Sequence, residues 1–437
     1  MGAVQKKKNS KESREKTRRE LAFRSLPDGA FADVIVIGSG PAGLLASITA
    51  AREGATVLVL ERKDEPCKKI YATGNGRCNF TNLSMEEGVY RGGGAGLAME
   101  AVDRFDRNDL LGFFQDLGLM TKHIGDYVYP YNEQAQAVAG VLLAEVMRCG
   151  AFLHTNELVT DVIPSEAGKE RFTVKTDRAS YKAHSVILAP GGKASPTHGS
   201  DGSLNKVIRR LGHQIVLQNP ALVPLLFEDK RFEKLSGTRL KCSVSFDTRK
   251  ETGEIIFNQD TISGIPVMQL SRFVVEALEK GEKCSLSLDF FPEETEDELR
   301  GLITNSFRSW ADPYRTAAQA LGFCLHQKMA DMILELLEIG QETKAASVGD
   351  EKLALLTKRL KDFPVAIVGN AGFSRAQVTS GGVSCEEITE QMGSKLIPGL
   401  YFAGEILDVD GTCGGYNLHF AFASGRIAGS AAAQKAK

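Results

Sequence analysis

DVIVIGSGPAG, residues 33–43, is the stretch that decides the fold of this chain. Its residues 34–37 are a continuous run of valine and isoleucine, as in a parallel strand that is covered on both faces. Gly38, Gly40 and Gly43 follow with the spacing G-x-G-x-x-G. In that pattern the first glycine permits a tight turn, the second lets the backbone approach a pyrophosphate, and the third lets a helix pack closely on its strand. We expect the helix over 41–52 to point its free N–H groups at that phosphate.

A second strand and an acidic residue support this interpretation. Residues 56–60, TVLVL, form another apolar run, and Glu61 follows it. Glu61 lies 18 residues after Gly43 (61 − 43), close to the spacing of about 20 at which a carboxylate accepts a ribose 2′-hydroxyl. The alternative is an ordinary βαβ unit with a solvent-facing glutamate. Strand, turn, helix and acid together favour a dinucleotide with an unphosphorylated 2′-hydroxyl, which fits both NAD and FAD.

Charge is distributed unevenly along the chain. The 437 residues carry a formal net charge of −2, but residues 1–20 hold eight Lys or Arg and three Glu, or +5, which leaves −7 for the remainder. This basic tail has no apolar segment of the kind that a secretory signal needs. We expect either a solvated terminus or an arm that contacts RNA phosphates. No stretch approaches the roughly 18 apolar residues of a membrane span, so we expect no membrane contact.

The eight cysteines include no C-x-x-C pair and no cluster with histidine. We therefore expect no metal site and no redox dithiol. Cysteines used in this way are typical of reduced thiols, which predicts a cytoplasmic protein.

The sequence of the middle of the chain predicts further strands and helices. Helices are expected over 103–118 and 134–148, and short strands over 152–155, 158–163, 171–176 and 180–189, the last of which returns to the nucleotide sheet. Residues 205–290 alternate in the manner of antiparallel strands, with a hairpin turn expected at Thr252-Gly253 and a helix from Pro266 to about Gly281. Residues 295–363 show leucine and methionine at helical spacing, which predicts short helices that form a cap over a cleft.

Two other segments are rich in glycine and polar residues. Residues 67–82, CKKIYATGNGRCNFTN, suit a loop beside a diphosphate or a flavin edge, although a basic surface loop has the same composition. Near the C-terminus, Gly404-Glu405 follow a short apolar strand, and Gly414-Gly415 open a helix over 416–432. A glycine pair at a helix start predicts a second anion site.

These residues resemble a known family, the YhiN/BaiN-like (BaiN/RdsA-type) NAD(P)/FAD-dependent oxidoreductases, which are two-dinucleotide-binding-domain flavoproteins. The motifs that carry the resemblance are GSGPAG (38–43) with Glu61, TGNGRCNFTN (73–82), LAPGGKASP (188–196), NPALVPL (219–225), AQVTSGGV (376–383) and GLYFAGEILDVDGTCGGYNLHFAFASG (399–425).

The resemblance implies an α/β fold in which a Rossmann-type FAD-binding domain is assembled from separated segments, with an inserted β-barrel-like domain and a small helical domain. The expected boundaries are a basic flexible tail over 1–30, the FAD-binding domain over 31–204 and 365–437, the β-rich domain over 205–292 and the helical cap over 293–364.

The resemblance also implies how FAD is bound. It places the phosphates at 38–43, the adenosine ribose at Glu61, the ring system near 76–79, the ribityl chain at Glu405, and residues 415–418 beneath the N1/O2 edge of the flavin. The cofactor-binding residues expected in this way are Gly38, Ser39, Gly40, Pro41, Ala42, Gly43, Glu61, Arg62, Lys69, Gly76, Arg77, Cys78, Asn79, Val159, Ala189, Gly191, Gly192, Gly404, Glu405, Gly415, Tyr416, Asn417 and Leu418.

FAD implies hydride chemistry at the flavin N5 atom. The chain has no second glycine turn of this type after a strand, so NAD(P)H is expected to bind transiently over the flavin. The resemblance implies a reductase of an activated C=C bond, in a steroid-like enone or in uracil of RNA. Cys78 is the candidate proton donor, and an inert packed cysteine is the alternative.

Two other functions stay open at this point. One is a flavin oxidase that passes electrons from a small amine to oxygen. The other is an RNA-associated flavoprotein whose basic tail contacts phosphates and whose flavin is largely structural.

Overall fold

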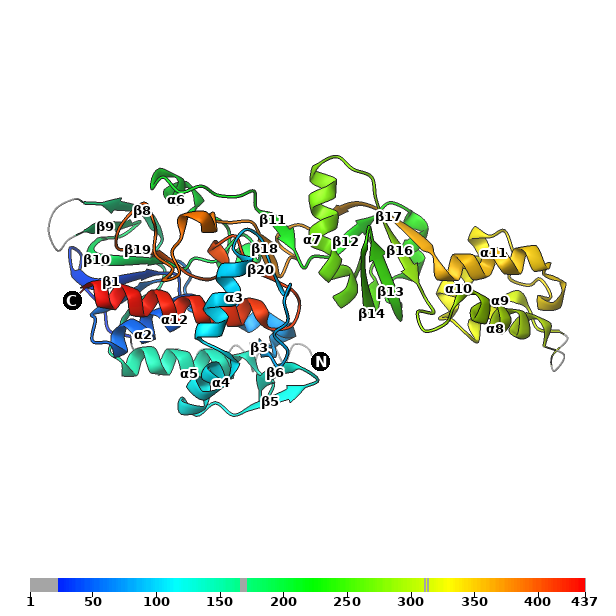
Figure 1. Ribbon diagram of the computed structural model, residues 1–437, viewed down its shortest axis with the longest axis horizontal. Helices are drawn as coiled ribbons and strands as arrows, with labels where there is room; N and C mark the ends of the chain where they lie inside the picture. Colours follow the sequence, from blue (N-terminus) through cyan, green and yellow to red (C-terminus); the bar gives the residue numbers. More distant parts are fainter. Residues whose placement is uncertain (1–22, 166–170, 310–311, 313, 437) are drawn as a thin grey trace. The chain divides into compact units, whose positions relative to one another are not determined.

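The computed structural model describes residues 23–165, 171–309, 312 and 314–436. The chain divides into two compact units, the first formed by Met1–Gln218 with Val378–Lys437 and the second by Asn219–Gln377. Figure 1 shows the elements of both, coloured along the sequence.

Within its described residues, the first unit contains a seven-stranded sheet with the order β7-β2-β1-β10-β9-β8, and β19 pairs with β10. β7 (Phe152–His154), β2 (Val57–Leu60), β1 (Phe31–Ile37), β10 (Ser180–Leu188) and β19 (Leu400–Phe402) are parallel, whereas β9 (Phe172–Thr176) pairs antiparallel with both β10 and β8 (Val159–Pro164). Both faces of β1 and β2 are covered, which is why their sequences are continuous apolar runs. The predicted Rossmann-type sheet from separated segments is therefore confirmed.

Two helices from opposite ends of the sequence pack on each other and on this sheet. α2 (Pro41–Arg52) and α12 (Tyr416–Ala436) are drawn in blue and red in Figure 1. A Cβ atom at Gly425 or Gly429 of α12 would lie closer than 3.0 Å to backbone atoms of Ala42 or Ala46 in α2. The two helix backbones therefore touch directly, with no side chain between them.

The remaining elements of the first unit surround this core. β3 pairs with β6 and β6 with β5 in a small sheet, and β20 pairs with β4. Their bounds, with those of the other helices and of β18, are α3 (Ala95–Arg104), α4 (Arg107–Asp116), α5 (Ala135–Arg148), α6 (Asn205–Arg210), β3 (Thr81–Asn82), β4 (Tyr90–Arg91), β5 (Thr121–Ile124), β6 (Tyr127–Pro130), β18 (Val378–Ser380) and β20 (Asp410–Gly411).

The second unit is a closed barrel with helices attached, which confirms the predicted barrel-like and helical parts. The barrel has the strand order β12-β15-β14-β13-β16-β17 and closes because β17 pairs with both β12 and β16. The elements of this unit are β11 (Asn219–Ala221), β12 (Leu225–Phe227), β13 (Arg239–Phe246), β14 (Arg249–Phe257), β15 (Thr261–Gly264), α7 (Ile265–Glu279), β16 (Cys284–Asp289), α8 (Glu296–Arg308), α9 (Ala317–Gly322), α10 (Gln327–Leu336), α11 (Asp350–Lys361) and β17 (Phe363–Asn370).

The hairpin turn expected at Thr252-Gly253 is wrong. β14 continues through both residues, and the chain reverses between β13 and β14, where Asp247 has a φ of +54°. Glycine suits position 253 for another reason. A Cβ atom there would lie 3.1 Å from Cγ of Pro266 at the start of α7. In this strand the glycine marks close packing of a helix rather than a turn.

The division into units differs from the expected domain boundaries at two places. Residues 205–218, expected in the β-rich domain, belong to the first unit, where Arg210 of α6 forms an ion pair of 2.9 Å with Asp161 of β8. Residues 365–377, expected in the FAD-binding domain, belong to the second unit, because β17 completes the barrel.

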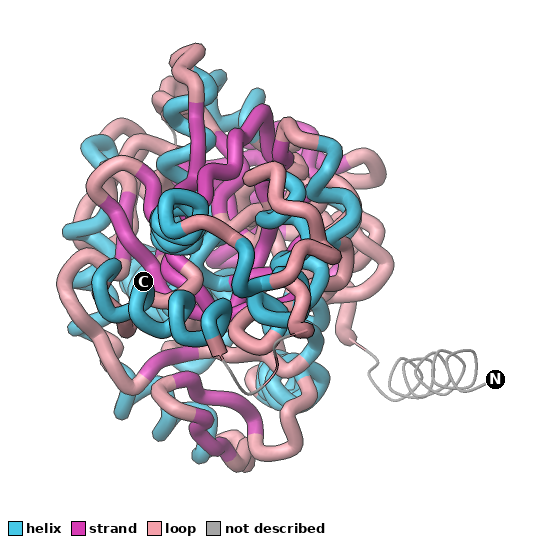
Figure 2. The backbone as a smooth tube through the Cα atoms, turned by 90° about the vertical axis from the view of Figure 1, so that its right-hand side faces the viewer, coloured by secondary structure: helices cyan, strands magenta, loops and turns pink. Residues whose placement is uncertain are grey.

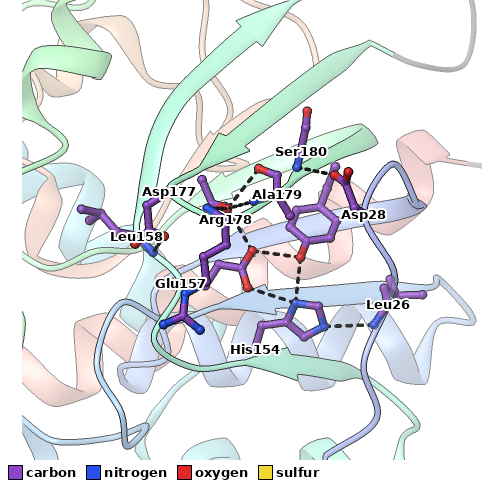
Figure 3. A network of polar contacts seen from close by, with 11 residues as sticks. Leu26, Asp28, His154, Glu157, Leu158, Asp177, Arg178, Ala179 and Ser180 are labelled. Atoms are coloured by element: carbon purple, nitrogen blue, oxygen red, sulfur yellow. Dashed lines mark hydrogen bonds and ion pairs between the residues drawn. The ribbon is translucent and has the colours of Figure 1, made fainter.

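Residues 1–22 of the predicted tail lie outside the described residues, but the end of that tail is attached to the sheet. The N–H of Leu26 donates to Nε2 of His154 at 3.0 Å, and the N–H of Ser180 donates to Asp28 at 2.9 Å (Figure 3). His154 in turn contacts the buried pair of Tyr181 and Glu157. The chain is thus held at the sheet from about Leu26 onward. Among the described residues, no helix is long and apolar enough to span a membrane.

Gly425→Ala tests the direct contact of α12 with α2. The added Cβ atom would meet the backbone of Ala42, so we expect the free energy of unfolding to fall by about 1–3 kcal/mol, although alanine favours a helix by roughly 1 kcal/mol. Denaturant unfolding measures this change. Gly112→Ala in α4 is the control, since nothing among the described atoms lies within 4 Å of its added Cβ. Equal effects of the two changes would contradict the direct contact.

Candidate dinucleotide-binding site

The turn after β1 is packed on one side and open on the other. Gly38 has a φ of +104°, and a Cβ atom there would lie closer than 3.0 Å to the Ala189 carbonyl group. A Cβ atom at Gly43 would collide with the carbonyl of Gly38, whereas one at Gly40 would have none of the described atoms within 4 Å. Gly40 is the N-cap of α2, and no described side chain caps this helix. The open side of Gly40 and the free N–H groups of α2 therefore form a candidate anion site.

Glu61 holds Ser39 within this turn. Its Oε2 accepts hydrogen bonds from the N–H and the hydroxyl of Ser39 at 3.0 and 2.6 Å, and its Oε1 accepts the N–H of Lys63 at 2.8 Å. The carboxylate thus fixes the glycine turn from within the protein. A carboxylate offers about four acceptor positions, so one is left for a ribose hydroxyl.

The segment after Glu61 brings positive charge to the turn. The N–H of Cys67 donates to the carbonyl of Ser39 at 3.3 Å, which places this segment beside the turn. The pKa of His198 is lowered, first by burial and then by Lys68, Lys69 and Lys63. The three lysines make the potential at this turn more positive, and a pyrophosphate would be attracted to it.

Lys69 and Glu405, both expected to bind the cofactor, contact each other. The Lys69 ammonium pairs with Oε2 of Glu405, and Oε1 of Glu405 accepts the N–H of Thr379 at 3.0 Å. The Thr379 hydroxyl accepts the N–H groups of Lys193 and Ala194 at 2.8 and 2.9 Å, and a Cβ atom at Gly192 would collide with it. The turn after β10 is therefore joined to the Gly404-Glu405 segment through Thr379 and the carboxylate of Glu405.

A second glycine turn lies at the start of α12. Gly415 has a φ of +93°, and a Cβ atom there would lie closer than 3.0 Å to the backbone of Thr81 and to Oδ1 of Asn79. Asn82 donates from Nδ2 to the carbonyl of Gly414 at 2.9 Å. The TGNGRCNFTN segment is thus held directly on the amino end of α12, as the ring-binding end of the expected site requires.

Tyr416 and Asn417 serve the backbone around this turn. The Asn417 side chain accepts the N–H of Gly411 at 2.7 Å and donates to its carbonyl at 2.8 Å. The Tyr416 hydroxyl donates to the carbonyl of Ser84 at 3.0 Å. These two side chains hold the backbone of the second glycine turn. They would therefore affect a bound cofactor through the position of that backbone.

The structure argues against Cys78 as the proton donor or as a cofactor contact. Protein atoms cover it completely, and burial raises the pKa of its thiol to about 12. A group that no ligand atom reaches does not transfer a proton to a substrate. The packed, inert cysteine is the better interpretation.

The two arginines that were expected to bind the cofactor form ion pairs within the protein. Arg77 is 55% exposed and forms an ion pair of 3.4 Å with Glu133. Arg62 pairs with Asp201, whose pKa is lowered because hydrogen bonds from Arg62 and Ser203 outweigh the opposing effect of burial. Val159 begins β8 and is buried near Glu61, since the N–H of Glu157 donates to the Glu61 carbonyl at 2.9 Å.

Several side chains at the site were not singled out from the sequence. Thr379 and Ser200 lie against the turn after β10, where a Cβ atom at Gly191 would come 2.8 Å from Oγ of Ser200. His198 lies in the field of three lysines. Each lies in or beside a glycine-rich motif, but only the fold shows which turn it faces.

The residues present fit FAD at both ends of a dinucleotide. Among the described residues, Asn79 Oδ1 at the second glycine turn and Ser200 Oγ at the Gly191 turn are buried without a hydrogen-bond partner. Such atoms cost about 1–3 kcal/mol each, which a ligand that pairs with them recovers. An open phosphate turn, a positive field and a second helix start complete the match.

The parallel sheet and the glycine turn define an α/β dinucleotide-binding protein of the Rossmann type. The HI0933-like protein Rossmann domain model matches residues 32–431, and the chain belongs to this family. It is a flavin-dependent oxidoreductase, as the sequence predicted.

Two relatives and one solved structure are similar over nearly the whole chain. A 3-dehydro-bile acid delta(4,6)-reductase of Clostridium scindens is 37% identical, covering 92% of this chain and 98% of its own length. A ribosomal RNA dihydrouridine synthase of Escherichia coli is 28% identical, covering 90% and 96%. The structure of 3-ketosteroid delta1-dehydrogenase from Sterolibacterium denitrificans has a TM-score of 0.50 at 12% identity, covering 92% of this chain and 99% of its own, and shares the fold.

Gly40→Ala separates cofactor binding from folding. The φ of Gly40 is −76°, which alanine adopts, and the added Cβ atom points into the open side of the turn. We expect the apoprotein to keep its stability within about 1 kcal/mol and its FAD affinity to fall at least tenfold, because the methyl group takes the place of a phosphate oxygen. Titration calorimetry measures the affinity. Unchanged FAD affinity would show that the pyrophosphate lies elsewhere.

The pKa of His198 should rise when the cofactor binds. Burial and three lysines lower it, and a pyrophosphate supplies negative charge that offsets the lysines. NMR titration of His198 with and without saturating ADP measures the shift. ADP that binds and leaves this pKa unchanged, or lowers it further, would place the anion away from the lysines.

Proposed function

We propose that this protein is an FAD-dependent reductase that adds two hydrogens to a C=C bond conjugated with a carbonyl group, with NAD(P)H as the transient electron donor. The observation that carries the proposal is the pair of glycine turns at Gly40 and Gly415, each at the start of a helix and together called the cradle, on a chain of this family. Steroid enones and uracil share the substrate chemistry, because uracil C5=C6 is conjugated with a carbonyl.

Residues of this chain would hold the cofactor along its length. The glycine turn and the start of α2 would bind the pyrophosphate, and Glu61 the adenosine ribose. Glu405 would accept from the ribityl chain and Lys69 would lie near it. When bound, FAD supplies hydride transfer, and the amino end of α12 would favour the anionic reduced ring at residues 415–418.

The named relatives support the type of reaction. The bile acid reductase is named for the saturation of a C=C bond, and the dihydrouridine synthase for a uridine product in which a C=C bond is saturated. The higher identity of the bile acid enzyme favours a small-molecule enone as the substrate. The +5 charge of residues 1–20 instead favours uracil in RNA.

The burial of Cys78 argues against this thiol as the source of the proton. A group at the open side of the ring, or a water molecule there, would protonate the substrate carbon next to the carbonyl. The chain's own part is to orient the ring and to exclude competing reactions.

Anaerobic flavin spectroscopy tests the proposal. We expect NADH or NADPH to bleach the oxidised flavin band, and a steroid enone or a uridine-containing RNA to restore it without oxygen. Each acceptor is added separately, and a saturated analogue is the control. Bleaching by a small amine in place of NAD(P)H, with reoxidation by oxygen alone, would instead establish the oxidase.

Truncation of residues 1–20 tests the remaining alternative, an RNA-associated flavoprotein. If the flavin is largely structural and the tail contacts RNA, truncation removes salt-dependent RNA affinity, and the full chain shows no turnover with either acceptor. Turnover with either one contradicts that alternative.

A further inference from the structure

We propose that His419 is a positioning residue that holds the 79–82 segment on the amino end of α12, and that it thereby sets the affinity and the spectrum of the bound flavin. The proposal rests on the FAD site proposed above and extends it to a residue whose side chain is fully buried in the protein.

His419 makes two hydrogen bonds in the core. The side chain is fully buried in the first turns of α12, with Nε2 2.9 Å from the Phe105 carbonyl oxygen and Nδ1 2.8 Å from the Thr81 hydroxyl. A carbonyl oxygen only accepts, so Nε2 must carry the proton, and Nδ1 accepts from the hydroxyl of Thr81. The geometry thus selects one tautomer of a neutral imidazole.

Burial keeps this imidazole neutral. It lowers the pKa of His419 to about 4, and the hydrogen bond to Phe105 and the charge of Asp106 offset the burial only in part. At neutral pH the ring therefore keeps both a donor and an acceptor, which the two bonds require.

The two bonds join three segments that are distant in the sequence. Phe105 ends α3, Thr81 lies in β3, and His419 belongs to α12. The N–H of His419 also donates to the carbonyl of Gly415 at 3.0 Å, so the imidazole and the glycine turn belong to one helical turn. A bond from His419 to Thr81 therefore acts directly on the contact between Thr81 and Gly415.

The contact between Thr81 and Gly415 leaves no room for a side chain at residue 415. A Cβ atom at Gly415 would lie 2.7 Å from both the N and the O of Thr81 and 2.8 Å from Oδ1 of Asn79. Asn79 Oδ1 is the buried acceptor without a partner at this end of the cradle, within the described residues. Release of Thr81 would move the Asn79 side chain and the free N–H groups of α12 relative to each other.

Substitutions at residue 419 separate hydrogen bonding from packing. His419→Leu fills similar space but leaves the Thr81 hydroxyl and the Phe105 carbonyl without partners. His419→Gln supplies an amide N–H for the carbonyl and an amide oxygen for the hydroxyl. A role through hydrogen bonds predicts rescue by glutamine, whereas a role through volume does not.

The experiment measures FAD binding to the full-length apoprotein by titration calorimetry, and the visible absorption of the bound flavin. We expect His419→Leu to weaken FAD binding roughly tenfold and to shift the flavin absorption maxima. We expect His419→Gln to restore both close to the values of the unmodified protein.

Two further variants control for folding. His213→Leu is the matched control, since His213 is also a buried imidazole of the first unit with two side-chain partners, Glu387 at 2.7 Å and Ser394 at 2.8 Å. It should lower stability and leave FAD affinity and spectrum unchanged. Thr81→Val removes the donor from the other side of the bond and should act like His419→Leu, which keeps the test decisive if His419→Leu does not fold.

The proposal is overturned if folded His419→Leu or Thr81→Val binds FAD with unchanged affinity and spectrum, or if His213→Leu has the same effect on both. It is also overturned if the unmodified protein does not bind FAD. None of these measurements uses a substrate. Loss of FAD affinity in His419→Leu, with rescue by glutamine, would therefore support the positioning role even if the protein reduces no C=C bond.

Discussion

The direct packing of α12 on α2 is the constraint on which the rest of the site depends. Gly425 and Gly429 bring the two helix backbones into contact, and no side chain larger than hydrogen fits between them at these positions. This contact fixes the start of one helix relative to the start of the other. Because each start presents unpaired N–H groups beside a glycine turn, the pair forms two anion-favouring ends at a set separation. The proposed FAD would span this pair, with its pyrophosphate at one helix start and its ring at the other.

Other close backbone contacts position the turns around these two helices. The turn after β1 lies on the turn after β10 through Gly38 and Ala189, and the 79–82 segment lies on α12 through Gly415. Side-chain hydrogen bonds then hold these turns in place. Glu61 accepts hydrogen bonds from Ser39 in the first turn, and His419 is hydrogen-bonded to Thr81 beside the second. A cradle assembled from backbone contacts is rigid, because closely packed interiors do not deform gradually. Its rigidity suits an enzyme whose protein part orients a cofactor rather than reacting itself.

The sequence predicted the elements whose patterns are local. The buried strands, the first glycine turn and the helix over 41–52 follow from periodicity and spacing, and the structure has all three. It did not predict partners that are set by tertiary contact. Lys69 and Glu405 are 336 positions apart and pair with each other, Arg77 pairs with Glu133, and Cys78 is wholly covered. Gly253 illustrates the same limit, since a glycine needed for helix packing has the same local signature as one in a turn.

The central claim is that one cofactor spans both glycine turns, with its pyrophosphate at Gly40 and its ring at Gly415. Competition calorimetry with the two halves of FAD tests this most directly. The account predicts that ADP and riboflavin each reduce the apparent affinity for FAD, that Gly40→Ala weakens ADP and spares riboflavin, and that ADP and riboflavin bind together without competing. Riboflavin that binds undiminished to the FAD-saturated protein, or ADP that does not compete with FAD, would contradict it.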